Sequence, residues 1–177
     1  VVAPVGLDHT DMLGDTLAEI ATEKAGIIKP DGYLISAAQD PEVATILLDT
    51  ARKQNAKYAF EGVEFGVVER ARAVGGQLLT LRGLAGEYPE IELPLHGEHQ
   101  GQNASLALAA VEAFFGGDRA LARDVVLAGF AQVRSPGRLE MIRSEPLVVL
   151  DAAHNPHGVR AASTAFKEAF ELSHVHA

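Results

Sequence analysis

Residues 33–54 read YLISAAQDPEVATILLDTARKQ, a short apolar stretch followed by a longer segment with helical periodicity. Residues 33–37 are typical of a buried strand. In residues 41–54, the apolar side chains that share one helical face are Ala44, Leu47, Leu48 and Ala51. The same order, a strand and then a helix, is predicted for residues 1–5 and 16–25. This alternation favours an α/β fold with a mostly parallel sheet covered by helices.

The next part of the chain, residues 57–95, has the pattern of short antiparallel strands. Turn signals such as Gly75-Gly76 separate its apolar stretches, which are residues 63–68, 77–81 and 91–95. We therefore expect a hairpin or a meander in this part. Helical periodicity then returns in two segments, residues 100–115 and 121–132.

Ser135-Pro136-Gly137 interrupts the chain and is the best candidate for a domain boundary. A predicted buried strand, residues 147–150, and a predicted helix, residues 156–170, follow it as the opening βα unit of a second α/β domain. We therefore predict two domains, residues 1–134 and residues 135–177. Because the chain opens on a strand of buried character and stops soon after a helix, we expect it to be a piece of a longer protein.

The composition is that of a globular protein. The chain has 177 residues, of which 47% are hydrophobic, and a net charge of −9. This acidic balance argues against nonspecific binding to nucleic acid or to an anionic membrane, but it leaves room for a local phosphate site. No apolar run approaches the length of a membrane span. The absence of cysteine excludes thiol chemistry and fits a cytoplasmic protein.

Lys24 ends a predicted helix in which Thr16 and Glu19 have the spacing of a capping box. The residues that fall on one face of this helix are Leu17, Ile20, Ala21 and Lys24. Desolvation shifts a lysine at the end of an apolar stripe towards its neutral form. Such a lysine can act as a base or nucleophile, or react with carbon dioxide to become an anionic carbamate. The alternative is that Lys24 extends its charge into solvent from the helix end, where a cation also suits the dipole.

The segment Asp151-Ala152-Ala153-His154-Asn155-Pro156 connects the predicted strand and helix of the second domain. In open α/β sheets, ligands bind beyond the carboxyl ends of strands and near helix N-termini. Asp151 and His154 could therefore hold a nucleotide phosphate or ribose and its metal shell. Alternatively, Asp151 or Asn155 only caps the turn or the helix, which would suit Pro156 at the first helical position.

Three other side chains are candidate ligand or metal contacts, although the sequence patterns around them are weaker. Arg138 follows a rigid turn, and its guanidinium suits phosphate oxygens, although a lone arginine there is also typical of a plain surface. Asn103 needs a polar partner, from a ligand or from the protein itself, because it shares a helical face with Leu106, Ala110 and Phe114. His9 could bind a metal, although imidazole suits zinc better than magnesium.

Five segments of the chain are modest motifs individually but highly specific in their order: Gly6-Leu7-Asp8-His9-Thr10, Glu23-Lys24-Ala25-Gly26-Ile27, Gly97-Glu98-His99-Gln100 with Gln102-Asn103-Ala104, Pro136-Gly137-Arg138-Leu139-Glu140, and residues 151–156. On these motifs, the chain closely resembles the dihydrofolate synthase/folylpolyglutamate synthase family of the Mur ligase superfamily, from Val1 to about Phe170. The resemblance implies the C-terminal part of the central ATP-binding domain, followed by the start of a Rossmann-like C-terminal domain.

The same resemblance implies roles for the candidate residues. His9 resembles a magnesium ligand of the ATP site. Lys24 matches the family's carbamylated lysine, whose anionic oxygen would lie near the metals. Asn103, Arg138 and Asp151 resemble residues that contact the nucleotide, and His154 corresponds to a histidine of the phosphate and metal environment.

The reaction implied by the resemblance is amide-bond formation. ATP phosphorylates a carboxylate of dihydropteroate or a reduced folate, and the amine of L-glutamate then displaces phosphate. We expect ATP and Mg²⁺ as cofactors, small molecules as the only partners (no nucleic acid and no membrane), and a cytoplasmic monomer.

One motif that the family needs upstream of His9 does not occur in these 177 residues, the phosphate loop G-x-x-x-x-G-K-[ST]. We therefore expect this stretch alone not to turn over ATP. Two other functions stay open: a different Mur-type amide ligase that acts on another carboxylate, and a truncated relative that only binds partners.

Overall fold

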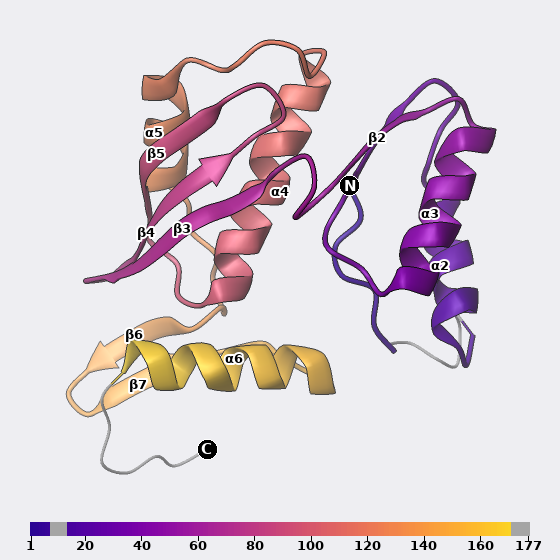
Figure 1. Cartoon of the computed structure of the whole chain (residues 1–177). Helices are drawn as coiled ribbons and strands as arrows, with labels where there is room; N and C mark the ends of the chain where they lie inside the picture. Colours follow the sequence, from indigo (N-terminus) through magenta and orange to yellow (C-terminus); the bar gives the residue numbers. More distant parts are fainter. Residues whose placement is uncertain (8–13, 171–177) are drawn as a thin grey trace. The chain divides into compact units, whose positions relative to one another are not determined.

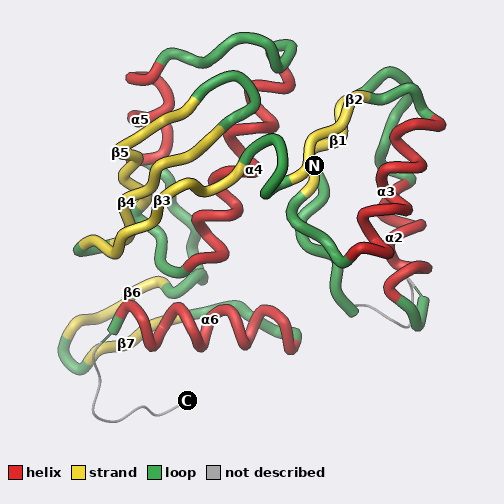
Figure 2. The backbone as a smooth tube through the Cα atoms, viewed as in Figure 1, coloured by secondary structure: helices red, strands yellow, loops and turns green. Residues whose placement is uncertain are grey.

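The computed structural model describes residues 1–7 and 14–170 (Figures 1 and 2). The described chain forms two compact units. The first comprises the described residues of Val1–Gly66, together with Arg82–Glu87 and Asn103–Leu121; the second comprises Val67–Leu81, Tyr88–Gln102 and residues 122–170. The predicted boundary at residue 135 lies inside the second unit, and the division into domains 1–134 and 135–177 stays a prediction.

The first unit contains a parallel strand pair, β1 (Tyr33–Ser36) and β2 (Lys57–Phe60). On the other edge of β1, Val2 forms a parallel bridge to Ser36. The Val2 amide donates to the Ile35 carbonyl at 2.8 Å, and the Val2 carbonyl accepts from the Ala37 amide at 2.9 Å. The predicted parallel sheet is therefore confirmed, but the strand predicted for residues 1–5 is reduced to this one bridge.

Helices α2 (Leu17–Ala25) and α3 (Pro41–Lys53) pack on these strands. Asp40 caps α3 by accepting a hydrogen bond from the Glu42 amide at 3.0 Å, and Pro41 occupies the first helical turn, where its missing N–H costs nothing. The fully buried residues of α3 are Val43, Leu47 and Ala51, whereas Ala44 and Leu48 are half-buried. The predicted apolar face thus includes two of the buried residues, Leu47 and Ala51, but the third is Val43 instead of Ala44.

The capping box predicted at the start of α2 is confirmed. Thr16 Oγ1 accepts from the Glu19 amide at 3.2 Å, and the Glu19 carboxylate accepts from the Thr16 amide at 3.1 Å. The two side chains therefore satisfy amide groups that the helix itself leaves without partners.

Replacing Thr16 with alanine is expected to lower the free energy of unfolding by about 1 kcal/mol, because the cap is lost. Thr22→Ala is the matched control: Thr22 lies in the same helix, is exposed, and only donates to the Ala18 carbonyl, so its loss should be neutral. Urea unfolding of both variants measures the difference. Equal effects would show that the capping box contributes nothing specific.

The three-stranded sheet has the order β3 (Gly66–Ala73), β4 (Gly76–Arg82), β5 (Glu87–Leu93), and Figure 1 shows the predicted meander. A tight turn at Val74-Gly75 joins the first two strands, and Gly75 adopts a φ of 80°, which favours glycine. The strand predicted at residues 63–68 begins later, at Gly66, because residues 60–65 are tied into a turn by the hydrogen bond from the Gly62 amide to the Phe65 carbonyl.

The remaining elements are α4 (Glu98–Phe114), α5 (Arg123–Ala131), β6 (Glu140–Ser144), β7 (Leu147–Leu150) and α6 (Pro156–Ala169). β6 and β7 form an antiparallel hairpin. Residues 147–150 form the predicted strand, but the prediction that this strand is buried is wrong. Val148 is 38% and Leu150 52% exposed. Burial alternates along β7, so only one of its faces is covered.

The chain is thus an α/β protein with a parallel strand pair, helices and small antiparallel sheets. In the part of the chain that the structure describes, no helix is long and apolar enough to cross a membrane.

Candidate functional site

Asp151 directly follows β7, and its carboxylate orders the loop that comes next. One carboxylate oxygen accepts from the Leu139 amide at 3.0 Å, and the other accepts from the Ala153 amide at 2.7 Å. The Gly137 carbonyl also accepts from the Ala152 amide at 2.8 Å. The two loops proposed to face the nucleotide, residues 137–139 and 151–153, are therefore held together by Asp151 and by the backbone.

The N-terminus of α6 has the cap that the sequence suggested. Asn155 Oδ1 accepts from the Gly158 amide at 2.7 Å, and Pro156 is the first helical residue. His154 precedes the cap, is exposed, and places Nδ1 at 3.1 Å from the Ala152 carbonyl oxygen. The capping roles left open for Asp151 and Asn155 are therefore both present, and the imidazole of His154 is accessible to a ligand.

Arg138 lies on the turn formed by Ser135-Pro136-Gly137. The Arg138 amide donates to the Ser135 carbonyl at 3.1 Å, and Gly137 adopts a φ of 71°, which an L side chain rarely tolerates. The guanidinium is exposed and lines a cavity of about 720 Å³ together with Arg134 and Ser135. The structure thus brings Arg138, Asp151 and His154 together on adjoining loops of the second unit.

The desolvation argued for Lys24 is wrong. The buried residues of α2 are Ile20, Ala21 and Ala25, so the buried stripe ends at Ala25 and leaves Lys24 exposed in the last turn. This geometry agrees with the alternative, a cation at the helix C-terminus, where it suits the helix dipole. The match of Lys24 to the family's carbamylated lysine does not depend on burial and stays a prediction.

The apolar face predicted for Asn103 is also wrong. Leu106 is buried and Ala110 is half-buried, but Asn103 is exposed and Phe114 is 84% exposed. The buried face of α4 passes instead through Ser105, Ala109 and Glu112. Asn103 is therefore accessible to a ligand.

The predicted magnesium ligand His9 lies outside the described residues. Among the residues that the structure describes, no three His, Asp or Glu side chains gather so that they could hold a metal ion. The metal assignment of His9 and Lys24 therefore stays a prediction.

Gln39, which sequence reasoning missed, fixes the segment that leads towards residue 9. Its side-chain oxygen accepts from the Val5 amide at 2.9 Å, and its side-chain nitrogen donates to the Ala3 carbonyl at 3.0 Å and to Ser36 Oγ at 3.3 Å. These hydrogen bonds hold Ala3 and Val5 to the segment that follows β1. A polar residue shortly after an apolar strand was the available signal in the sequence.

Glu61 makes the equivalent connection at the end of β2. One of its carboxylate oxygens accepts from Ser105 Oγ of α4 at 3.0 Å, and the other accepts from the Ala38 amide at 3.3 Å. Ser105 is fully buried, so this hydrogen bond is shielded from water. Glu61 therefore fixes α4, the helix that carries Asn103, to the carboxyl ends of the parallel strands.

Among the residues that the structure describes, burial displaces the pKa values of two side chains. Burial raises the pKa of the Tyr33 hydroxyl, and the nearby Glu64 and Glu112 carboxylates raise it further. Burial lowers the pKa of His96, which precedes α4. Neither group belongs to the loops of Arg138, Asp151 and His154.

The lowered pKa of His96 predicts a loss of stability in mild acid. The folded protein favours the neutral imidazole of His96. Below pH 6.5 the unfolded chain therefore binds a proton more readily than the folded protein, and the free energy of unfolding falls as the pH falls. We expect the wild-type protein to lose more stability than the His96→Gln variant between about pH 7.5 and pH 5.5. Urea unfolding at the two pH values measures both losses, and equal losses would contradict the assignment.

Comparison with known proteins shows which proteins the chain resembles. No protein-family model matches the chain. The dihydrofolate synthase/folylpolyglutamate synthase of Mycobacterium tuberculosis is 50% identical over 97% of the chain. A crystal structure of M. tuberculosis folylpolyglutamate synthase complexed with ADP and AMPPCP superposes with a TM-score of 0.91 at 51% identity over 96% of the chain. A folylpolyglutamate synthase–AMPPCP–folate complex superposes with a TM-score of 0.89 at 32% identity over 97% of the chain.

The chain spans 37% of the length of the M. tuberculosis relative, and 39% and 42% of the two solved chains. The similarity thus includes nearly every residue of this chain and less than half of each relative. The fold matches the predicted part of a Mur ligase, with a parallel sheet, helices and small antiparallel sheets. Over nearly its whole length, the chain is homologous to the dihydrofolate synthase/folylpolyglutamate synthases of the Mur ligase superfamily.

Proposed function

We propose that the protein containing this chain is an ATP-dependent ligase that adds L-glutamate to dihydropteroate, to folate polyglutamates, or to both. The observation that carries the proposal is the 50% identity over 97% of the chain to the M. tuberculosis enzyme. Relatives crystallised with ADP, AMPPCP and folate support nucleotide and folate as its ligands.

The chemistry requires activation of a carboxylate, because a carboxylate does not react with an amine. In the proposed reaction, a carboxylate oxygen of the pteroate or folate attacks the γ-phosphorus of ATP, and ADP leaves. The glutamate amine then attacks the acyl carbon, the carbon–oxygen bond to phosphate breaks, and the amine loses a proton. Water must be excluded from the acyl phosphate, since hydrolysis would waste it.

The described residues supply parts of this reaction. Arg138, on its rigid turn, would neutralise charge as the γ-phosphoryl group moves. Asp151 would hold the Arg138 loop in place through the Leu139 amide, and His154 would reach the phosphates from the start of α6. We assign Asn103, exposed on α4, to contact with the nucleotide.

Magnesium would supply charge neutralisation at the phosphates, with His9 and a carbamate on Lys24 as its protein ligands. The described residues do not form a metal site by themselves, so no step is derived through the ion. A carbamate would give Lys24 the anionic oxygen that an ammonium lacks, and its exposed position leaves it accessible to carbon dioxide and to a metal.

The remaining proposals follow from the same homology. We propose a monomer that acts in the cytoplasm on small molecules alone, built with a domain boundary between residues 134 and 135. Residues 1–177 by themselves would not turn over ATP, since they contain no phosphate loop of the G-x-x-x-x-G-K-[ST] type.

The test is a substrate panel with the protein at its full encoded length. Release of phosphate is measured with ATP, L-glutamate and one carboxylate: dihydropteroate, tetrahydrofolate, or a muramyl peptide precursor. We expect turnover with one or both pterin substrates. Turnover only with the muramyl precursor would favour another Mur-type ligase, and turnover with none would favour a non-catalytic relative.

A further inference from the structure

In the second unit, α6 packs directly on the segment that joins β5 to α4. Gly97 adopts a φ of 96°, and a Cβ at this position would lie 2.5 Å from the Cβ of Ala165 in α6. Ala165 is 2% exposed, and the ring centroids of His96 and Phe170 are 5.5 Å apart. Only glycine permits so close an approach of the helix.

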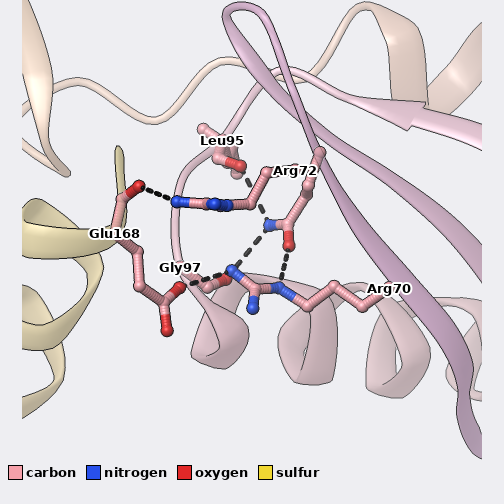
Figure 3. Close-up of polar contacts among 6 residues, drawn as sticks. Arg70, Arg72, Leu95, Gly97 and Glu168 are labelled. Atoms are coloured by element: carbon pink, nitrogen blue, oxygen red, sulfur yellow. Dashed lines mark hydrogen bonds and ion pairs between the residues drawn. The ribbon is translucent and has the colours of Figure 1, made fainter. Parts of the chain in front are cut away.

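Arg70 of β3 connects these two elements, as Figure 3 shows. Its Nη2 forms an ion pair with Glu168 Oε2 of α6 at 2.8 Å, and its Nε donates to Gln77 Oε1 at 2.7 Å. Arg72 adds a hydrogen bond to the Glu168 carbonyl at 2.9 Å. We call the set of Arg70, Gln77 and Glu168 the Arg70 bridge.

Gln77 links Arg70 to the backbone segment that precedes α4. It is 2% exposed, and its side-chain nitrogen donates to the carbonyls of Leu95 at 2.9 Å and Gly97 at 3.0 Å. Both hydrogens of this nitrogen and the side-chain oxygen are therefore used, so the amide has a single orientation. The position of the Leu95–Gly97 backbone is thus linked through Gln77 and Arg70 to Glu168.

The chemistry of the bridge is specific to arginine. A guanidinium presents Nε–H and Nη–H groups in one rigid plane, so it can donate to the Gln77 amide and to the Glu168 carboxylate at once. A lysine ammonium has the charge but not this forked geometry. The side chains of Arg70 and Glu168 are 22% and 35% exposed, so water competes only in part for the ion pair.

We propose that Arg70 is a positioning residue, which holds α6 and the His154 loop preceding it against the start of α4. The proposal rests on the ligase function above, because its consequence is for nucleotide binding. His154 directly precedes the N-cap of α6 in the second unit. When the Arg70 bridge is broken, α6 is no longer held in position, and neither is the nucleotide contact assigned to His154.

The test uses the protein at its full encoded length and two measurements. Hydrogen exchange of residues 156–169 without nucleotide reports how firmly α6 is held, and calorimetry gives the Kd for ADP. For Arg70→Met we expect faster exchange in α6 and an ADP Kd about tenfold higher. Arg70→Lys keeps the charge and should give an intermediate result for both quantities.

The matched control is Arg123→Met. Arg123 forms a 2.6 Å ion pair with Glu90 in the same unit, but its side chain is 50% exposed and the carboxylate partner 75% exposed. We expect no change in α6 exchange or in the Kd for ADP. If Arg70→Met does not fold, Arg70→Lys and Glu168→Gln provide the same comparison, since each leaves the packing of the side chain largely intact.

The outcomes separate the bridge from the ligase function. Unchanged α6 exchange in Arg70→Met overturns the proposal, and faster exchange with an unchanged Kd for ADP overturns its link to the nucleotide. A wild-type protein that does not bind ADP contradicts the ligase function and that link, while α6 exchange still decides whether Arg70 holds the helix.

Discussion

Replacing Lys24 with alanine is expected to lower kcat for folate–glutamate ligation by about 10²- to 10³-fold in the protein at its full encoded length. The expectation follows from the proposed carbamate on Lys24, since alanine cannot carry the anionic group proposed to lie near the phosphates. Lys24 is exposed at the end of α2, outside the core, so the fold should persist. Initial rates with saturating ATP measure the effect.

Two controls distinguish the carbamate from the positive charge. Lys29→Ala removes another exposed lysine, whose ammonium donates only to the Gly26 carbonyl at 3.3 Å, and should leave kcat unchanged. Lys24→Arg keeps the cation at the helix end but cannot form the carbamate, and should be as inactive as Lys24→Ala. Added bicarbonate should raise the wild-type rate alone. Full activity in Lys24→Ala would remove Lys24 from the site.

Replacing Glu112 with alanine is expected to lower the free energy of unfolding by about 2–5 kcal/mol. Glu112 is fully buried in α4, and its carboxylate accepts hydrogen bonds from the Leu84 and Ala85 amides between β4 and β5. Alanine leaves both amides without this partner. A Cβ at Gly83 would clash with the same carboxylate, so the loop is shaped around it.

Urea unfolding measures this loss, with Glu69→Ala as the control. Glu69 lies exposed in the middle of β3, so its removal should change the free energy of unfolding by less than about 0.5 kcal/mol. Glu112→Gln retains an acceptor oxygen and should fall between the two. A Glu112→Ala variant as stable as the wild type would show that the loop finds its partners elsewhere.

The parts of the fold that could be predicted are those in which local pattern and tertiary structure agree. The segment of residues 33–54 has a buried apolar strand and a helix with its own N-cap, and both form as predicted. β6 could not be predicted, because Glu140–Ser144 is mostly exposed and lacks apolar alternation. It forms by pairing with β7, and a pairing partner is not recorded in local sequence.

The motifs of the candidate site could be predicted from the sequence, but the burial of its side chains could not be predicted as well. Asn155 and Pro156 signalled the start of α6 correctly, because capping is a local property. The burial of Lys24 and Asn103 was mispredicted, because helical periodicity gives a stripe but not its exact edges. Gln39 and Glu61 were missed since their partners, Val5 and Ser105, are distant in sequence.

The proposed function depends on one step, the activation of a carboxylate as an acyl phosphate by the protein that contains this chain. Its most direct test is to supply dihydropteroate labelled with oxygen-18 in the carboxylate, together with ATP and L-glutamate, and to analyse the released phosphate by mass spectrometry. We expect one labelled oxygen in each phosphate, because the carboxylate oxygen leaves with the phosphoryl group. Amide product formed with unlabelled phosphate would contradict it.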